Sequence, residues 1–186
     1  MSVVVVRPGD NARLAVALAL LNRCLGEQIY SPAKLAEVTR DGEALLITWD
    51  DGGVQAAAVA RLLYAEDDSY YASFGPVATN LFRGHRVGSL EALAVEEVRR
   101  HQGIGRQLTL DQMSWLARQG CEFAVAVSWL SGGSGTSAGM YRDLGFEGTP
   151  PVADFYLAES IRDGWTCPTC RGPCHCSAAF YWRRLR

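Results

Sequence analysis

The centre of the sequence combines small and basic residues in a way that suits phosphate binding. An apolar, strand-like run at residues 90–95 is followed by a turn that contains Gly103 and Gly105, and a helical pattern begins there. Glycines let backbone N–H groups approach a ligand closely, and the start of a helix adds roughly half a positive charge. Arginines beside such a turn can pair with phosphate oxygens. The turn therefore predicts a site for a polyanion, of which a pyrophosphate fits best; the flanking arginines are Arg99, Arg100 and Arg106.

Two familiar phosphate-binding loops do not match this turn. A Walker A loop needs a Gly-Lys-Ser/Thr end, but the only lysine, Lys34, lies 69 residues before Gly103. A dinucleotide-binding Rossmann loop needs a third glycine where this chain has Leu108. A plain strand-to-helix connector without a ligand stays the alternative.

The turn also resembles a family signature. Arg100-x-x-Gly103-x-Gly105 follows a strand that reads Glu91-x-Leu-Ala-Val95. This arrangement resembles the (Gln/Arg)-x-x-Gly-x-(Gly/Ala) signature of the GNAT acetyltransferase superfamily, with the strand before it and the helix after it at the family's usual spacing.

Two further features extend the resemblance to roughly residues 2–150. The segment from Met140 to Phe146 is similar to the family's Tyr-x-x-x-Gly-Phe segment, and the order of expected strands and helices is the family's order. One departure is Ser134, which stands where many members have Asn. The resemblance implies transfer of an acyl group, usually acetyl, from coenzyme A to an amine, with acetyl-CoA as donor. It also implies a set of CoA-binding residues: Leu93, Ala94, Val95, Arg100, His101, Gln102, Gly103, Ile104, Gly105, Arg106 and Ser134.

Such a transfer needs a proton acceptor for the incoming amine. Holding an amine with a lysine-like pKa of about 10.4 neutral at pH 7 costs roughly 4–5 kcal/mol. A nearby carboxylate offsets part of this cost as a general base, directly or through a water. Glu91 lies on the strand two residues before Leu93, and we expect it to be this base. The alternative is a strand carboxylate that pairs with an arginine across the sheet.

The departing thiolate benefits from a proton donor, and we expect Tyr141 to fill this role because many family members use a tyrosine at the matching point. The alternative is a core tyrosine whose hydroxyl is already hydrogen-bonded. A strand N–H near Leu93 can stabilise the oxyanion. The sequence has no Gly-x-Ser-x-Gly nucleophile elbow, which fits direct transfer without a covalent acyl-enzyme.

Four cysteines near the end of the sequence predict a metal site. Cys167, Cys170, Cys174 and Cys176 fall within ten residues in C-x2-C-x3-C-x-C spacing, and four thiolates of this kind form a closed, structural zinc site. Free thiols, disulfides and an iron–sulfur cluster are the alternatives, and His175 can replace one cysteine. We expect this zinc-knuckle-like cluster to pin residues 150–176 as an insertion before a last strand at 178–185, and to shape the acceptor pocket or an interface.

The hydrophobic periodicity predicts a mixed α/β domain with an antiparallel front half and a central βαβ unit. The resemblance implies that residues 1–186 form a single domain with the GNAT fold, a mixed and mostly antiparallel sheet with flanking helices. Residues 64–87 have no clear pattern and are left without an assignment. The expected strands are 3–6, 44–49, 54–63, 89–95 and 121–129, and the expected helices are 11–23, 32 to about 41, 104–119 and 136–144.

The composition excludes some classes of binding partner. The net charge of −2 argues against a nucleic-acid binder, and no apolar run is long enough to span a membrane. The first residues lack a signal-peptide pattern, so we expect a cytoplasmic protein. The acceptor is expected to be a small-molecule or peptide amine, and a homodimer stays open. Two other functions also stay open: a non-catalytic CoA-binding or zinc-knuckle interaction module, and an acyltransferase that uses a carrier-protein-bound acyl donor.

Overall fold

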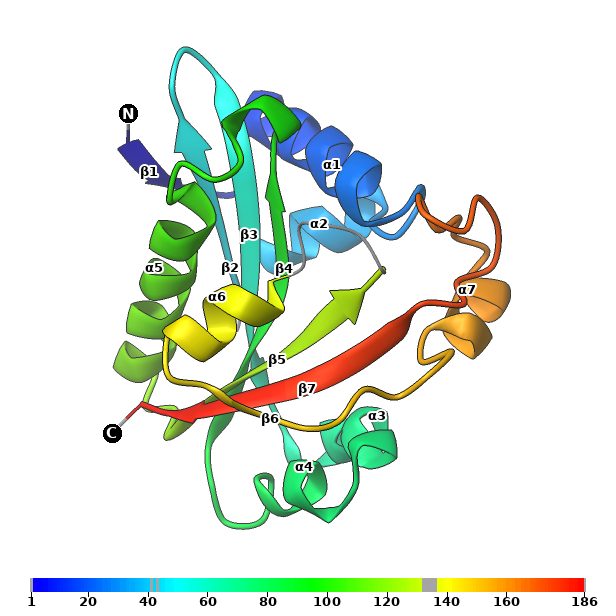
Figure 1. The fold of residues 1–186 in the computed structure, drawn as a ribbon. Coiled ribbons are helices and arrows are strands. Elements are labelled where there is room, and N and C mark those ends of the chain that lie inside the picture. Colours follow the sequence, from blue (N-terminus) through cyan, green and yellow to red (C-terminus); the bar gives the residue numbers. More distant parts are fainter. Residues whose placement is uncertain (1, 41, 43, 132–136, 186) are drawn as a thin grey trace.

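The computed structural model describes residues 2–40, 42, 44–131 and 137–185. Its strands form one seven-stranded sheet in the order β1-β2-β3-β4-β5-β7-β6, with helices on both faces (Figure 1). Neighbouring strands are antiparallel except β4 and β5, which are joined through α5 as the expected βαβ unit. The strands are β1 Ser2–Val5, β2 Ala44–Asp50, β3 Val54–Leu63, β4 Val87–Val95, β5 Phe123–Leu130, β6 Glu147–Gly148 and β7 Ser177–Arg184.

Helices α1 (Asn11–Leu25) and α2 (Pro32–Val38) cover one face of the sheet, and α5 (Ile104–Arg118) and α6 (Ala138–Asp143) cover the other. Each helix buries an apolar stripe, which is the usual reason that an amphipathic helix docks on a sheet. On the α5 face the stripe includes the fully buried Leu108 and Leu116. The two layers place the end of α1 and the start of α5 on opposite sides of β4.

Local signals located these elements correctly. The Asp10 carboxylate accepts from the Arg13 N–H at 3.2 Å at the start of α1, and the Ser31 hydroxyl accepts from the Lys34 N–H at 3.1 Å at the start of α2. Gly145 follows α6 with φ of 77°, the left-handed conformation expected after a helix end. The expected helix 136–144 is shorter in the structure, and its residue 136 lies outside the described residues.

The segment at residues 64–87 forms a series of short helices: η1 Ala65–Asp67, α3 Asp68–Tyr71, η2 Ala72–Phe74 and α4 Pro76–Asn80. Its aromatic side chains pack against β7, with the Tyr71 and Phe180 rings 5.5 Å apart. Between β6 and β7 the chain adds another short helix, α7 (Leu157–Asp163), which the sequence analysis did not predict. The first segment is held mainly by aromatic packing, and the chain between β6 and β7 is also held by isolated backbone bridges, Val152 with Ala178 and Thr166 with Glu27.

Strands β4 and β5 diverge along their length. Their parallel pairing covers only Val87–Ser89 and Phe123–Val125, although the strands continue to Val95 and Leu130. From Leu90 onward, the edge of β4 that faces β5 is therefore open. Unpaired main-chain groups on an open strand edge are available to hydrogen-bond an extended ligand.

Candidate active site

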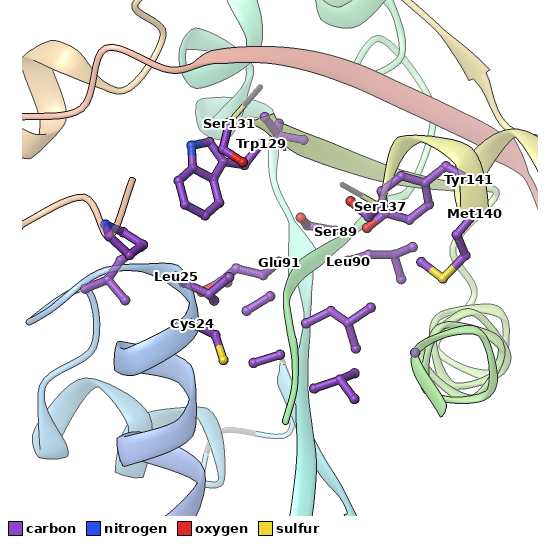
Figure 2. Close-up of a pocket in the computed structure, with 18 of the residues that line it drawn as sticks. Cys24, Leu25, Ser89, Leu90, Glu91, Trp129, Ser131, Ser137, Met140 and Tyr141 are labelled. Atoms are coloured by element: carbon purple, nitrogen blue, oxygen red, sulfur yellow. The ribbon is translucent and has the colours of Figure 1, made fainter. Parts of the chain in front are cut away.

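A cavity of about 1130 Å³ follows the open edge of β4. It extends from the turn before α5 to the segment that includes Tyr156 and Thr169, and it is bounded by the ends of α1 and β5. Figure 2 shows Glu91 extending from β4 toward Leu25 of α1, with Tyr141 coming from α6 on the other side of the view. The cavity is thus long enough to join the phosphate turn to both predicted catalytic side chains.

The turn has the backbone geometry that the glycines predicted. Gly103 has φ of 80°, in the left-handed region, and α5 begins at the next residue. Gly105 lies against β4, because a Cβ added there would be 3.4 Å from Leu93 Cδ2. The first N–H groups of α5 therefore sit beside the open strand edge, where a helix start attracts a phosphate.

The arginines at the turn have different partners. The Arg100 Nε donates to the Val95 carbonyl at 3.2 Å, and an Arg99 Nη lies 3.1 Å from Asp51 Oδ2. Both side chains are thereby held at the cavity wall, which Arg106 also lines. Guanidinium groups gathered beside a helix start are suited to bind a diphosphate.

Most of the residues expected to bind CoA line this cavity. They are Leu93, Ala94, Val95, Arg100, His101, Gly103, Ile104, Gly105 and Arg106. Gln102 is not among the lining residues, and its side-chain amide donates to the Val98 carbonyl at 3.2 Å. Ser134 lies outside the described residues, while Ser131, at the end of β5, lines the cavity.

Glu91 sits at a β-bulge. The register of β3 and β4 pairs Val59 with Ala92 and Ala60 with Leu90, so Glu91 is the extra residue. A bulge redirects the side chain it carries. The buried Gln112 of α5 supports the bulge, since its Nε2 donates to the Val59 carbonyl at 2.7 Å. Neither the bulge nor the Gln112 contact could be predicted from the sequence.

The Glu91 carboxylate has two partners. The Tyr30 hydroxyl donates to Oε1 at 2.7 Å, and the Arg61 Nε lies 2.7 Å from Oε2. Arg61 is on the neighbouring strand β3, so the alternative expectation of a cross-sheet ion pair is met. Burial and the nearby carboxylate raise the pKa of Tyr30 well above its usual value, which keeps the phenol protonated as a donor. These two contacts orient the carboxylate at the cavity wall.

Tyr141 lines the cavity and is only 4% exposed. Burial raises the pKa of its phenol to about 12, an effect reduced by a hydrogen bond with Ser137. The hydroxyl therefore carries a proton at neutral pH, as a general acid must. Figure 2 shows Ser137 beside the Tyr141 ring.

The four sulfur atoms of Cys167, Cys170, Cys174 and Cys176 all lie within 4.8 Å of one another, and none is in a disulfide. The Sγ of Cys176 lies 3.9 Å from that of Cys167 and 3.7 Å from that of Cys170. Four thiolates at 2.3 Å from a tetrahedral ion would be about 3.8 Å apart. His175 points elsewhere, with Nδ1 3.0 Å from Asp154 Oδ1. The donor set and spacing fit a tetrahedral metal ion.

The comparisons with known proteins agree with the fold. The model of the acetyltransferase (GNAT) family matches residues 18–146. The chain therefore belongs to the GNAT acetyltransferase family, and it is an acyltransferase with the mixed α/β fold of that family. A search of curated proteins gave no match.

Solved structures with this fold cover nearly the whole chain. Arabidopsis thaliana NAA60 in complex with acetyl-CoA has a TM-score of 0.67 at 14% identity, covering 98% of this chain and 97% of its own. The ribosomal-protein-S18-alanine N-acetyltransferase from Escherichia coli has a TM-score of 0.64 at 16% identity, covering 99% and 93%. The GNAT-like decarboxylase GphF in complex with isobutyryl-CoA has a TM-score of 0.65 at 17% identity, covering 100% of both chains. At these identities the similarity shows the fold alone. Among the described residues, no helix is long and apolar enough to cross a membrane.

Proposed function

We propose that the protein transfers the acetyl group of acetyl-CoA to a primary amine by direct attack. The observation that carries this proposal is the continuous cavity, which begins at the phosphate turn and reaches both Glu91 and Tyr141. A cofactor diphosphate held at the start of α5 would lay its pantetheine arm along the open edge of β4. Main-chain N–H and C=O groups beyond Leu90 would then pair with the amides of that arm.

Glu91 would act as the general base for the amine. Its carboxylate attracts an ammonium group and accepts a proton from it, directly or through a water. The Tyr30 hydroxyl donates to Glu91, and its oxygen can at the same time accept from an amine N–H. Proton transfer through Tyr30 to Glu91 is therefore a second route that this contact allows. Arg61 orients the carboxylate before the amine arrives.

Tyr141 would act as the general acid for the leaving group. Its buried phenol donates a proton, or a hydrogen bond, to the sulfur of CoA as the C–S bond breaks. An N–H of the open β4 edge near Leu93 would stabilise the oxyanion. The acetyl carbon passes from sulfur to nitrogen, and the protein carries no covalent intermediate.

We also propose that the four cysteine thiolates hold a structural Zn²⁺ ion. The fit of the sulfur spacing supports this, as do two N–H groups that donate to sulfur: Cys170 N–H to Cys167 Sγ at 3.3 Å and His175 N–H to Cys170 Sγ at 3.4 Å. Such donors stabilise thiolates around a metal. Four protein ligands leave no coordination position for a substrate, so the ion would take no part in acetyl transfer.

The function is tested by measuring CoA formed from acetyl-CoA in the presence of pooled primary amines, with detection by chromatography. We expect amine-dependent CoA formation together with acetylated amine. Calorimetric binding of acetyl-CoA without amine-dependent turnover would favour the non-catalytic CoA-binding module. Competition between free acetyl-CoA and an acylated carrier protein would separate the two donor types.

A further inference from the structure

The end of the cavity farthest from the phosphate turn is built by segments that are distant in the sequence. One side comes from the loop after α1 and from β3 with the short helix α3. The other side comes from the end of β5 and from the chain between β6 and β7. The lining residues of this second side are Trp129, Tyr156, Glu159, Trp165, Pro168 and Thr169.

The segment before the first cysteine is docked onto the loop after α1. Glu27 and Thr166 form an antiparallel bridge, with N–H to carbonyl distances of 3.0 Å and 3.2 Å. The Trp165 ring packs against Gly26, where an added Cβ would lie 3.0 Å from Trp165 Cε3. Trp165 is 6% exposed and belongs to the same packed cluster as the cysteines. The indole is thus clamped between the loop and the metal site.

The cysteines connect directly to the cavity wall. Pro168 and Thr169, which line the cavity, are the two residues between Cys167 and Cys170. Their position is therefore set by the turn that brings these two sulfurs together. A movement of either sulfur moves this part of the wall.

Two further contacts lead from the cysteines to the wall. The Cys174 N–H donates to Ser160 Oγ at 2.9 Å, which ties the metal site to α7, the helix that carries Glu159. Trp129 of β5 and Tyr156, just before α7, pack against the cluster that contains the cysteines. The cysteine cluster therefore contacts the wall at β5 and at α7.

We propose that residues 156–176 form the acceptor-binding wall of the enzyme, held in position by the metal ion on the four thiolates, and that this wall accepts a primary amine carried on an apolar body. The inference rests on the proposed function and adds the location and class of the acceptor. This wall does not block the phosphate turn, because the turn lies at the other end of the cavity.

The class of acceptor follows from the groups on the wall. Two indole rings, a phenol and a proline ring present apolar faces to the cavity. Three carboxylates line the same end, those of Asp67, Glu91 and Glu159, against two cations, Lys34 and Arg61, so an ammonium group meets net negative charge there. Aromatic faces favour both an apolar body and a nearby cation. 2-Phenylethylamine combines these features and is the probe amine.

The first test places a large side chain on this wall and leaves the four cysteines unchanged. Thr169→Trp places an indole in the cavity, whereas Ile161→Trp places the same ring at an exposed residue of α7 that does not line it. We expect Thr169→Trp to raise KM for 2-phenylethylamine about tenfold or more. The Kd for acetyl-CoA and the metal content should stay unchanged, and Ile161→Trp should behave as wild type. A KM unchanged by Thr169→Trp, or an equal rise in the Kd for acetyl-CoA, overturns the proposal.

The second test removes the metal. Chelation should raise KM for the amine while calorimetry still detects acetyl-CoA binding, and added Zn²⁺ should restore the original KM. Cys170→Ser should reproduce the loss in metal content, and Cys24→Ser, at a cysteine outside the cluster, should keep it. A metal-free protein with an unchanged amine KM overturns the role of the metal.

The two proposals fail in different ways. If no amine of the panel is acetylated, the proposed function is wrong. If hydrophilic amines such as spermidine or glucosamine are acetylated with higher kcat/KM than 2-phenylethylamine, the acetyl transfer stands and the acceptor class is wrong.

Discussion

The Tyr141→Phe substitution removes one oxygen atom from the cavity wall and little else. The Tyr141 ring centroid lies 5.2 Å from that of Phe146 and 5.4 Å from that of Tyr181, and a phenylalanine keeps both contacts. The lost hydrogen bond with Ser137 costs about 1 kcal/mol of folding stability. The fold therefore persists, and a larger effect on rate reports on the phenol.

The size of the effect follows from proton affinities. Because burial raises the pKa of Tyr141 to about 12, the phenol stays protonated at every pH used in the assay. A thiolate with a pKa of about 8.5 gains about 2 kcal/mol when it ends protonated at pH 7 and Tyr141 regains its own proton from solvent, since each pKa unit is worth about 1.4 kcal/mol. This free energy corresponds to a rate factor of about 30, and it disappears when the pH exceeds the pKa of the thiol.

We expect the kcat of Tyr141→Phe to be about 30-fold below wild type at pH 7 and to approach wild type at pH 9.5. The assay is chromatographic detection of CoA at saturating acetyl-CoA and amine, because thiol-reactive dyes would also modify the cysteine cluster. The ratio of the two enzymes cancels the ionisation of the amine. A ratio that stays constant between these pH values would refute proton donation by Tyr141, and an unchanged kcat at pH 7 would remove the residue from the mechanism.

Four other perturbations test separate parts of the site. Glu91→Gln cannot accept a proton, so kcat/KM for the amine should fall by about 10²–10⁴ at pH 7 with the acetyl-CoA Kd unchanged; a loss below threefold contradicts the base role. Gly103→Ala forces a side chain into a left-handed backbone at φ of 80°, and should lower the melting temperature by about 2–4 °C and weaken acetyl-CoA binding in calorimetry. Gln112→Leu removes the donor to the β-bulge and should lower kcat and cost about 1–3 kcal/mol in urea unfolding, whereas Gln107→Leu, on the exposed side of the same helix, should change neither. The raised pKa of Tyr141, about 12, stabilises the fold below pH 10, where the unfolded phenol is still neutral; this contribution should be lost between pH 10 and 12, as thermal melts would show.

Features encoded by neighbouring residues were predictable from the sequence. The caps at Asp10 and Ser31 and the glycine turn each depend on a few adjacent residues, so their spacing alone located the helices and the turn before α5. The cysteine cluster is local in the same way, because its four sulfurs come from ten residues.

Features that depend on contacts between distant residues were not predictable. Tyr30 reaches Glu91 across 61 residues, and the bulge that presents Glu91 depends on the pairing of β3 with β4. No periodicity encodes either contact. The short helices at residues 64–87 could not be predicted for a related reason, since they are held by aromatic packing on β7. The bridge between Thr166 and Glu27 could not be predicted from the sequence either.

The position of β7 in the sheet has a consequence for the order of folding. This strand is formed by residues 177–184, yet it lies between β5 and β6, and Ser177 directly follows the last cysteine. Until β7 inserts, the edge of β5 at Phe123–Leu130 is an unpaired apolar template, which invites aggregation. Binding of a metal ion by the four cysteines would place the chain at the position where β7 begins. Refolding yield should therefore depend on the presence of Zn²⁺ during renaturation rather than on its addition afterwards.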